Sequence, residues 1–91
     1  MNTVNLVRYG AVLTGREFGK DVFLSLKREF KFPLVLDFAG VEAVGSSFGD
    51  EVVPKVAAEQ GNVIKILNAN EDVRATLKDI EHDSGIKVEI E

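Results

Sequence analysis

The chain has 91 residues, 45% hydrophobic and 29% charged, which is the composition of one small domain with an ordinary buried core. It contains no cysteine, which excludes disulfides, thiolate zinc sites and a cysteine nucleophile. Fifteen acidic and eleven basic side chains give a net charge of −4, so a nucleic acid would be repelled and is not an expected partner. No apolar run reaches the roughly 20 residues of a membrane span, and no signal-peptide pattern is visible. We therefore expect a cytoplasmic protein without a membrane partner.

The first half of the chain predicts two strands with a helix between them. Residues 3–7 (TVNLV) alternate and are β-branched, which is typical of a strand. Thr14 and Glu17, in TGRE, match a capping box and predict the start of a helix. Its apolar side chains recur at helical spacing: Phe18, Val22, Leu26 and Phe30. Residues 34–38 (LVLDF) form a short apolar run that is typical of a buried strand in a parallel sheet.

The second half repeats this alternation. A helix is expected from the Ser46–Ser47 pair to about Gln60, followed by a strand over residues 63–67 (VIKIL). Asn70 is a good N-cap for a third helix that closes near residues 84–85, and residues 86–90 (IKVEI) predict the last strand. The order βαβαβαβ predicts one α/β domain over residues 1–91, with a mostly parallel four-stranded sheet and helices packed on it.

Pro54 lies inside the expected second helix, where a proline removes a backbone hydrogen bond and crowds the preceding turn. We expect a kink at this position. Four apolar side chains of this helix should still face the sheet: Phe48, Val52, Val53 and Val56.

Four acids lie near the carboxyl end of the second strand, the edge of a parallel sheet where ligands often bind: Asp37, Glu42, Asp50 and Glu51. Asp37, Asp50 and Glu51 together could hold Mg²⁺ through carboxylate oxygens. Each also has a structural interpretation. Asp37 can accept hydrogen bonds from loop amides, and negative charge is favourable in the first helical turn. His82 is the only histidine, which leaves no catalytic triad and favours a role at a helix C-terminus.

Ser46 and Ser47 stand where the second helix begins. A serine at this position commonly caps the helix by accepting a hydrogen bond from an orphan backbone N–H. A helix N-terminus is also where a phosphate group is best accommodated. The pattern therefore leaves both a cap and a phosphorylation site open.

From residue 13 onward the chain resembles the STAS family, the domain of bacterial anti-sigma-factor antagonists. The matching segments are LTG before the first helix, LVLDFAGVEAVGSS, GNVIKIL and DSGIKVEI, in the family's order and spacing. The serine pair followed by phenylalanine and an acidic turn, SSFGDE, is similar to the STAS-like domain of unknown function. The resemblance implies a small α/β STAS-like fold without catalytic activity or a cofactor.

In anti-sigma-factor antagonists the motif at this helix is aspartate, two serines and glycine, and a partner kinase phosphorylates the first serine. By position the resemblance implies Ser46 as the phosphoacceptor candidate, with Ser47 after it. Gly45 stands where that aspartate is expected, and Phe48 where the glycine is. Asp50 and Glu51 would add negative charge within a turn of Ser46, against which a phosphate would be repelled.

We therefore predict a non-enzymatic, regulatory protein-interaction module that is switched by serine phosphorylation. Its partner would be a serine kinase or ATPase of the anti-sigma type. A basic patch on that partner would be attracted to the acidic corner of this chain. The expected contact surface is Gly45, Ser46, Ser47, Phe48, Asp50 and Glu51. The alternative is a metal- or small-ligand-binding site built from Asp37, Asp50 and Glu51.

Overall fold

The fold was analysed in a computed structural model that describes residues 2–91. The elements, in chain order, are β1 (Asn2–Asn5), the 3₁₀ turn η1 (Leu6–Tyr9), β2 (Val12–Leu13), α1 (Arg16–Glu29), β3 (Leu34–Asp37), β4 (Ala43–Val44), α2 (Ser46–Ala58), β5 (Val63–Leu67), α3 (Glu71–Ser84) and β6 (Lys87–Ile90). The predicted βαβαβαβ order is confirmed for the four longer strands and three helices. The sequence did not predict η1, β2 or β4.

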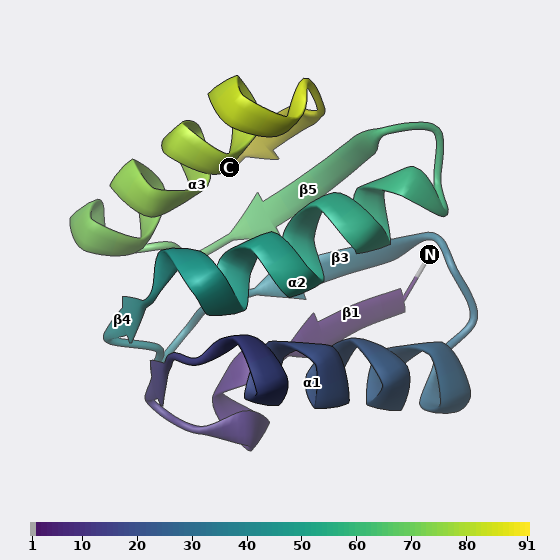
Figure 1. The fold of residues 1–91 in the computed structure, drawn as a ribbon, viewed down its shortest axis with the longest axis horizontal. Coiled ribbons are helices and arrows are strands. Elements are labelled where there is room, and N and C mark those ends of the chain that lie inside the picture. The colour runs from purple at the N-terminus through teal and green to yellow at the C-terminus, as the bar shows by residue number, and fades with distance from the viewer. Residues whose placement is uncertain (1) are drawn as a thin grey trace.

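β1, β3, β5 and β6 form one fully parallel sheet, in the order in which they occur along the chain. Crossovers between parallel strands are right-handed, so a strand order that advances in one direction places every connecting helix on the same face. Figure 1 shows this arrangement, with α1, α2 and α3 lying side by side in front of the strands. The fold is therefore a two-layer α/β structure.

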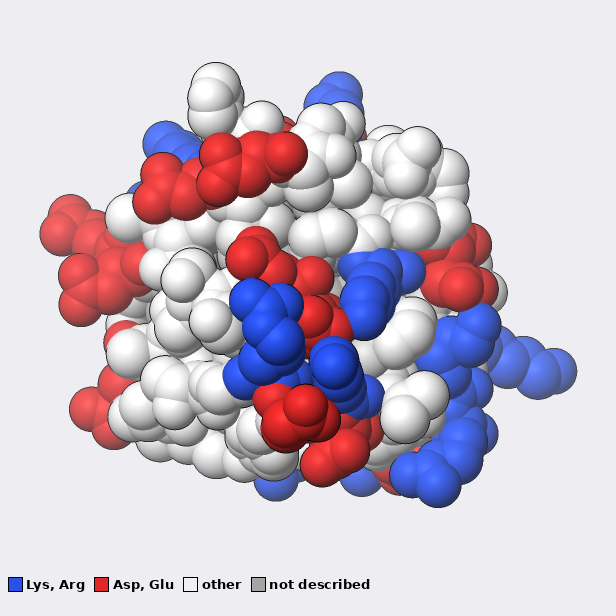
Figure 2. Space-filling model, viewed as in Figure 1, with Lys and Arg blue, Asp and Glu red and all other residues white. Residues whose placement is uncertain are grey.

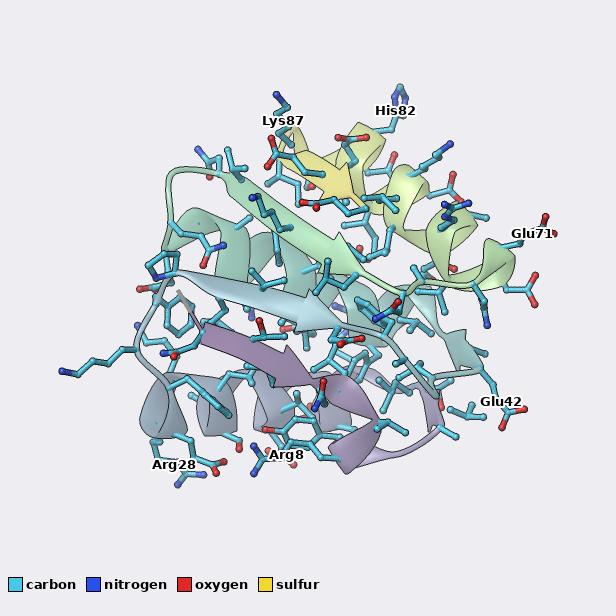
Figure 3. All side chains as sticks on the ribbon, turned by 180° about the vertical axis from the view of Figure 1, so that it is seen from behind. Arg8, Arg28, Glu42, Glu71, His82 and Lys87 are labelled. Atoms are coloured by element: carbon cyan, nitrogen blue, oxygen red, sulfur yellow. The ribbon has the colours of Figure 1, made fainter. Side chains whose placement is uncertain are left out.

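Within residues 2–91 no helix covers the opposite face of the sheet, and Figure 3 looks directly onto it. The strand register places Thr3, Val35, Lys65 and Glu89 in one row across this face. Lys65 lies 3.8 Å from the Glu91 carboxylate, and Lys87 lies 3.8 Å from the Glu89 carboxylate. Charged side chains therefore cover a face that most parallel sheets bury under a second helical layer.

The core lies between the sheet and the helices. The sheet contributes the alternate residues that point toward the helices, among them Val4, Leu36, Ile64 and Ile66, all at most 1% exposed. The helices contribute their apolar stripes, which are centred on Val22 and Leu26, Val52 and Val56, and Leu77 and Ile80. This burial is the main favourable term in the stability of the fold.

α2 is the central helix and contacts both of its neighbours and the sheet. Its four predicted sheet-facing residues are all buried: Phe48, Val52, Val53 and Val56. The helix continues through Pro54 and ends at Ala58, two residues before the predicted end. None of the helices in residues 2–91 has both the length and the apolar character needed to cross a membrane.

Candidate functional site

The candidate site is the segment Gly45–Glu51, which we call the α2 corner. It is positioned by a small second sheet in which β2 and β4 pair in parallel. The Gly45 N–H donates to the Leu13 carbonyl over 2.8 Å and extends this pairing by one bond. Because β2 leads into α1 and β4 leads into α2, the two helices begin next to each other at the carboxyl edge of the strands, as Figure 1 shows.

The two serines do not cap α2, so that prediction is wrong. The N-cap residue is Gly45, with φ −76° and ψ 150°, and Ser46 is already the first helical residue. The bond from Gly45 to Leu13 holds Gly45 in the extended conformation of β4, which places the helix start immediately after it. Ser46 is exposed and Ser47 is half-buried.

The capping box predicted for α1 is absent as well. The helix begins at Arg16, and its N-cap is Gly15, which has φ +96° and no side chain to offer. Thr14 instead faces the α2 corner, because a Cβ built on Gly45 would lie 3.2 Å from the Thr14 Cγ2 atom. At both helix starts a glycine occupies the N-cap position, where a threonine or serine hydroxyl was predicted.

Phe48 anchors the first turn of α2 from beneath. Its side chain is 1% exposed, and its ring centroid lies 5.5 Å from that of Phe18 on α1. The helices approach closely at Gly19, where an added Cβ would lie 2.9 Å from both the Phe48 carbonyl and the Glu51 Cβ. Phe48 is therefore part of the core, and not of the exposed contact surface on which the sequence had placed it.

Glu51 lies in the second turn of α2 and points toward α1 rather than into solvent. Its carboxylate accepts hydrogen bonds from Lys55 over 2.5 Å and from Arg16 over 2.7 Å, and the residue is only 7% exposed. These bonds, first from Lys55 and then from Arg16, lower the pKa of Glu51 below its ordinary value. Figure 2 shows the resulting cluster of both charge signs in the middle of the helical face.

The expected acidic corner is consequently not formed. The first turn of α2 contains no acidic residue, and the charge of Glu51 is already compensated by two cations. Asp50 is exposed and is the one acidic side chain that the α2 corner itself presents to solvent. The charge repulsion predicted for a phosphate on Ser46 is reduced to that of Asp50, four residues further along the helix.

The acids proposed as a metal site are separated. The Asp37 carboxylate accepts from the Ala39 N–H and from the Asn68 amide at 2.9 and 3.0 Å, as its structural interpretation predicted. Glu42 points outward, as Figure 3 shows. Within residues 2–91 no three histidine, aspartate or glutamate side chains come together to hold a metal ion. Asp37, Asp50 and Glu51 therefore do not form the expected metal site.

The strand order explains why no switch-point crevice forms at this edge of the sheet. Ligands of open α/β sheets bind in the crevice where the strand order reverses. The order β1-β3-β5-β6 never reverses, so helices lie on one face only and no such crevice opens. His82 is exposed in the last turn of α3 and points away from the protein, as Figure 3 shows.

Sequence reasoning missed two residues that shape the α2 corner. Lys55 stands four residues after Glu51, a helical ion-pair spacing that could have identified it. Arg16 lies 35 residues from Glu51 in the chain, and no local pattern indicates that contact.

Comparison with known protein families matches residues 15–74 to the STAS-like domain of unknown function (DUF4325). The match begins at the N-cap of α1 and ends in the first turns of α3, so it includes the whole α2 corner. No curated protein and no solved structure matches the chain. Because the family match covers well over half of the 91 residues, the chain belongs to the STAS-like domain family of unknown function.

Proposed function

We propose that this domain is a regulatory protein-interaction module whose α2 corner binds a protein partner and is switched by phosphorylation of Ser46. The partner would be a serine kinase or ATPase of the anti-sigma type in the cytoplasm, as the STAS resemblance implies. The domain itself would carry out no catalysis. The unmodified domain would bind this partner, and the phosphorylated domain would be released from it.

The observation that carries this proposal is the state of the α2 N-terminus. Ser46 is exposed and is the first residue of the helix, and neither an acidic side chain nor a side-chain cap occupies the first turn. The first four N–H groups of a helix have no partner within it, and the helix dipole places partial positive charge there. A phosphate on Ser46 would therefore meet a favourable field and unpaired donors.

The chemistry would be a phosphoryl transfer from ATP. The Ser46 Oγ atom would attack the γ-phosphorus, the bond to the β-phosphate oxygen would break, and ADP would leave. A carboxylate base of the kinase would take the hydroxyl proton. The domain has only to present the hydroxyl, which the exposed first helical position does.

Gly45 marks a departure from the anti-sigma antagonist motif that fits this structure. A side chain at this position would press against Thr14, because an added Cβ would lie 3.2 Å from the Thr14 Cγ2 atom. The chain therefore has no side chain at this position between β4 and α2, where an antagonist has an aspartate. A kinase for this domain would recognise Ser46 without that carboxylate.

The test is to incubate the domain with ATP and a serine kinase of the anti-sigma type, and to locate phosphate by mass spectrometry. We expect one phosphate on Ser46 in the wild type, none in Ser46→Ala, and an unchanged yield in Ser47→Ala. Phosphate on neither serine would contradict the switch. Binding of the kinase should also be lost in Ser46→Asp and retained in Ser46→Asn, which has nearly the same volume and no charge.

A further inference from the structure

A second surface, formed by elements other than the α2 corner, lies between α3 and the edge strand β6. It is a groove of about 360 Å³ lined by Arg74, Lys78, Glu81, Val88 and Ile90. The first three residues follow one another at helical spacing along one flank of α3. Val88 and Ile90 are half-buried and give the groove an apolar floor. In Figure 3, β6 forms the outer margin of the sheet beside α3.

The backbone of β6 is paired on one side only, because β6 is the last strand of the sheet. Its contacts with β5 and the preceding loop use alternate residues, with Lys87 donating to the Asn62 carbonyl and Glu91 donating to the Ile66 carbonyl. In a strand the N–H groups of neighbouring residues point to opposite sides. The backbone groups of Val88 and Ile90 therefore face the open edge.

Glu81 occupies one of these open positions. Its carboxylate accepts the Val88 N–H over 2.7 Å, so a side chain of α3 stands where the carbonyl of a further strand would bond. An unpaired strand edge is a template for another extended chain, and proteins commonly block it with a charged side chain. Here the block covers a single N–H, while the Ile90 backbone beside it has no partner among residues 2–91.

The charges beside the groove indicate what kind of segment would fit. Within the part of the chain that the structure describes, neither Arg74 nor Lys78 forms an ion pair. Both are exposed on α3, above the apolar floor, in a protein whose net charge is −4. Two cations that have no ion pair within residues 2–91, at an open strand edge, favour a partner that brings carboxylates.

We propose that the β6 edge binds an extended acidic segment of a partner protein, which adds to the sheet as a fifth strand. Backbone hydrogen bonds to Val88 and Ile90 would supply the pairing, and one strand carbonyl would displace the Glu81 carboxylate. Side chains of the segment that point toward the helical layer would carry carboxylates to Arg74 and Lys78. A second copy of this chain fits poorly, because its own β6 presents Val88 and Ile90 on that face.

The test uses a capped six-residue peptide of alternating glutamate and valine, titrated into the isotopically labelled 91-residue chain and followed by amide NMR. We expect the largest shifts at the Val88 and Ile90 N–H groups. The double variant Arg74→Glu, Lys78→Glu should weaken binding at least about tenfold. The matched control Arg28→Glu, Lys31→Glu changes the net charge equally on exposed residues of another surface and should bind as the wild type does.

Two variants of Glu81 provide a second test, because a surface that acts only through its charge would not distinguish them. Glu81→Gln removes the charge and keeps a hydrogen-bond acceptor, whereas Glu81→Ala removes both. If the carboxylate competes for the Val88 N–H, the alanine variant should bind the peptide more tightly than the glutamine variant. Equal binding by the two variants would overturn the displacement of Glu81.

Three further results would overturn the proposal as a whole. One is the absence of shifts at Val88 and Ile90 at millimolar peptide, and another is equal binding of a lysine–valine peptide of the same length. The third is a dimer by light scattering that dissociates in the Arg74→Glu, Lys78→Glu variant, which would assign the edge to a second copy of the chain. None of these results bears on phosphorylation of Ser46.

Discussion

The N-termini of α2 and α3 lie at the same edge of the sheet, and the two helices begin in different ways. At α3 the Asn70 side chain accepts the Val73 N–H over 2.8 Å, and Glu71 and Asp72 add negative charge to the first turn. At α2 the cap is Gly45, and the first turn has neither a side-chain cap nor an acid. The first turn of α3 is thus stabilised by its own side chains, whereas that of α2 is left open to an outside group.

The start of α2 has no side-chain cap, and two other contacts hold it. Phe48 fixes its first turn from the core, and Glu51 ties its second turn to Arg16 at the start of α1. These contacts lie on the inner and flanking sides of the helix. A change in charge at Ser46 can therefore occur without breaking a contact that the fold depends on, which is what a surface switch requires.

The largest expected effect comes from removing the anchor of α2. Phe48→Ala should lower the free energy of unfolding by about 3–5 kcal/mol, because it deletes a fully buried ring and leaves a cavity. The matched control is Phe18→Ala, which removes the ring that Phe48 contacts but whose own side chain is 38% exposed. Urea unfolding should give a clearly smaller loss for Phe18→Ala. Equal losses would mean that the first turn of α2 is not held from beneath.

The next effect comes from the tie between α1 and α2. Glu51→Gln should lower the free energy of unfolding at neutral pH by less than Phe48→Ala does. This loss of free energy should be larger than the loss from removing a neutral helix cap, because Glu51 accepts two hydrogen bonds from charged donors, Lys55 and Arg16. The conservative control Asp50→Asn removes an exposed acid from the same turn and should leave the urea midpoint nearly unchanged.

The pH dependence of stability sharpens this prediction. The folded pKa of Glu51 is below its ordinary value of 4.5, so its contribution is complete above that pH and is lost as the pH falls through the folded pKa. Glu29 acts in the same direction, since hydrogen bonds from Ser25 and Arg8 lower its pKa. Urea midpoints at pH 7 and below pH 4 should therefore differ less in Glu51→Gln than in the wild type. An unchanged difference would show that Glu51 is not ion-paired in solution.

The cap of α3 should have a smaller effect. Asn70→Ala should cost about 1 kcal/mol, because it leaves the Val73 N–H without its acceptor. The Asn70 amide also donates to the Val41 and Glu42 carbonyls, at 3.3 and 3.0 Å. Asn70→Ser keeps a capping oxygen but does not reach these carbonyls, so its urea midpoint should lie between those of the wild type and the alanine variant. A serine variant no better than alanine would assign the stabilisation to the carbonyl bonds.

The two helix starts also show how far the sequence alone could lead. Asn70 and the strand over residues 63–67 are set by local chemistry, and both predictions are confirmed. The serine cap failed because Gly45 is held extended by Leu13, a residue 32 positions earlier, through the short pairing of β2 with β4. Two-residue strands carry no readable alternation, so their pairing could not be predicted.

The acidic charge predicted for the α2 corner was wrong for a related reason. Asp50 and Glu51 are neighbours in sequence, but successive residues of a helix point about 100° apart. Asp50 therefore faces solvent while Glu51 faces Arg16, and only the position of α1 decides which one is buried. The uncovered sheet face likewise follows from strand order, a property of the whole fold that no single segment encodes.

The smallest expected effect tests the open N-terminus of α2 directly. Ser46→Asp places a negative charge on the first helical residue, where no other acid stands, and should raise the free energy of unfolding by about 0.3–1 kcal/mol at low ionic strength. Ser46→Asn, of nearly equal volume and no charge, is the control, and Ser46→Lys should shift the urea midpoint in the opposite direction. The gain should shrink in high salt, because exposed charges are screened. A loss of stability in Ser46→Asp would mean that Asp50, one turn further along, outweighs the helix dipole, and a phosphate at Ser46 would then be opposed by the fold itself.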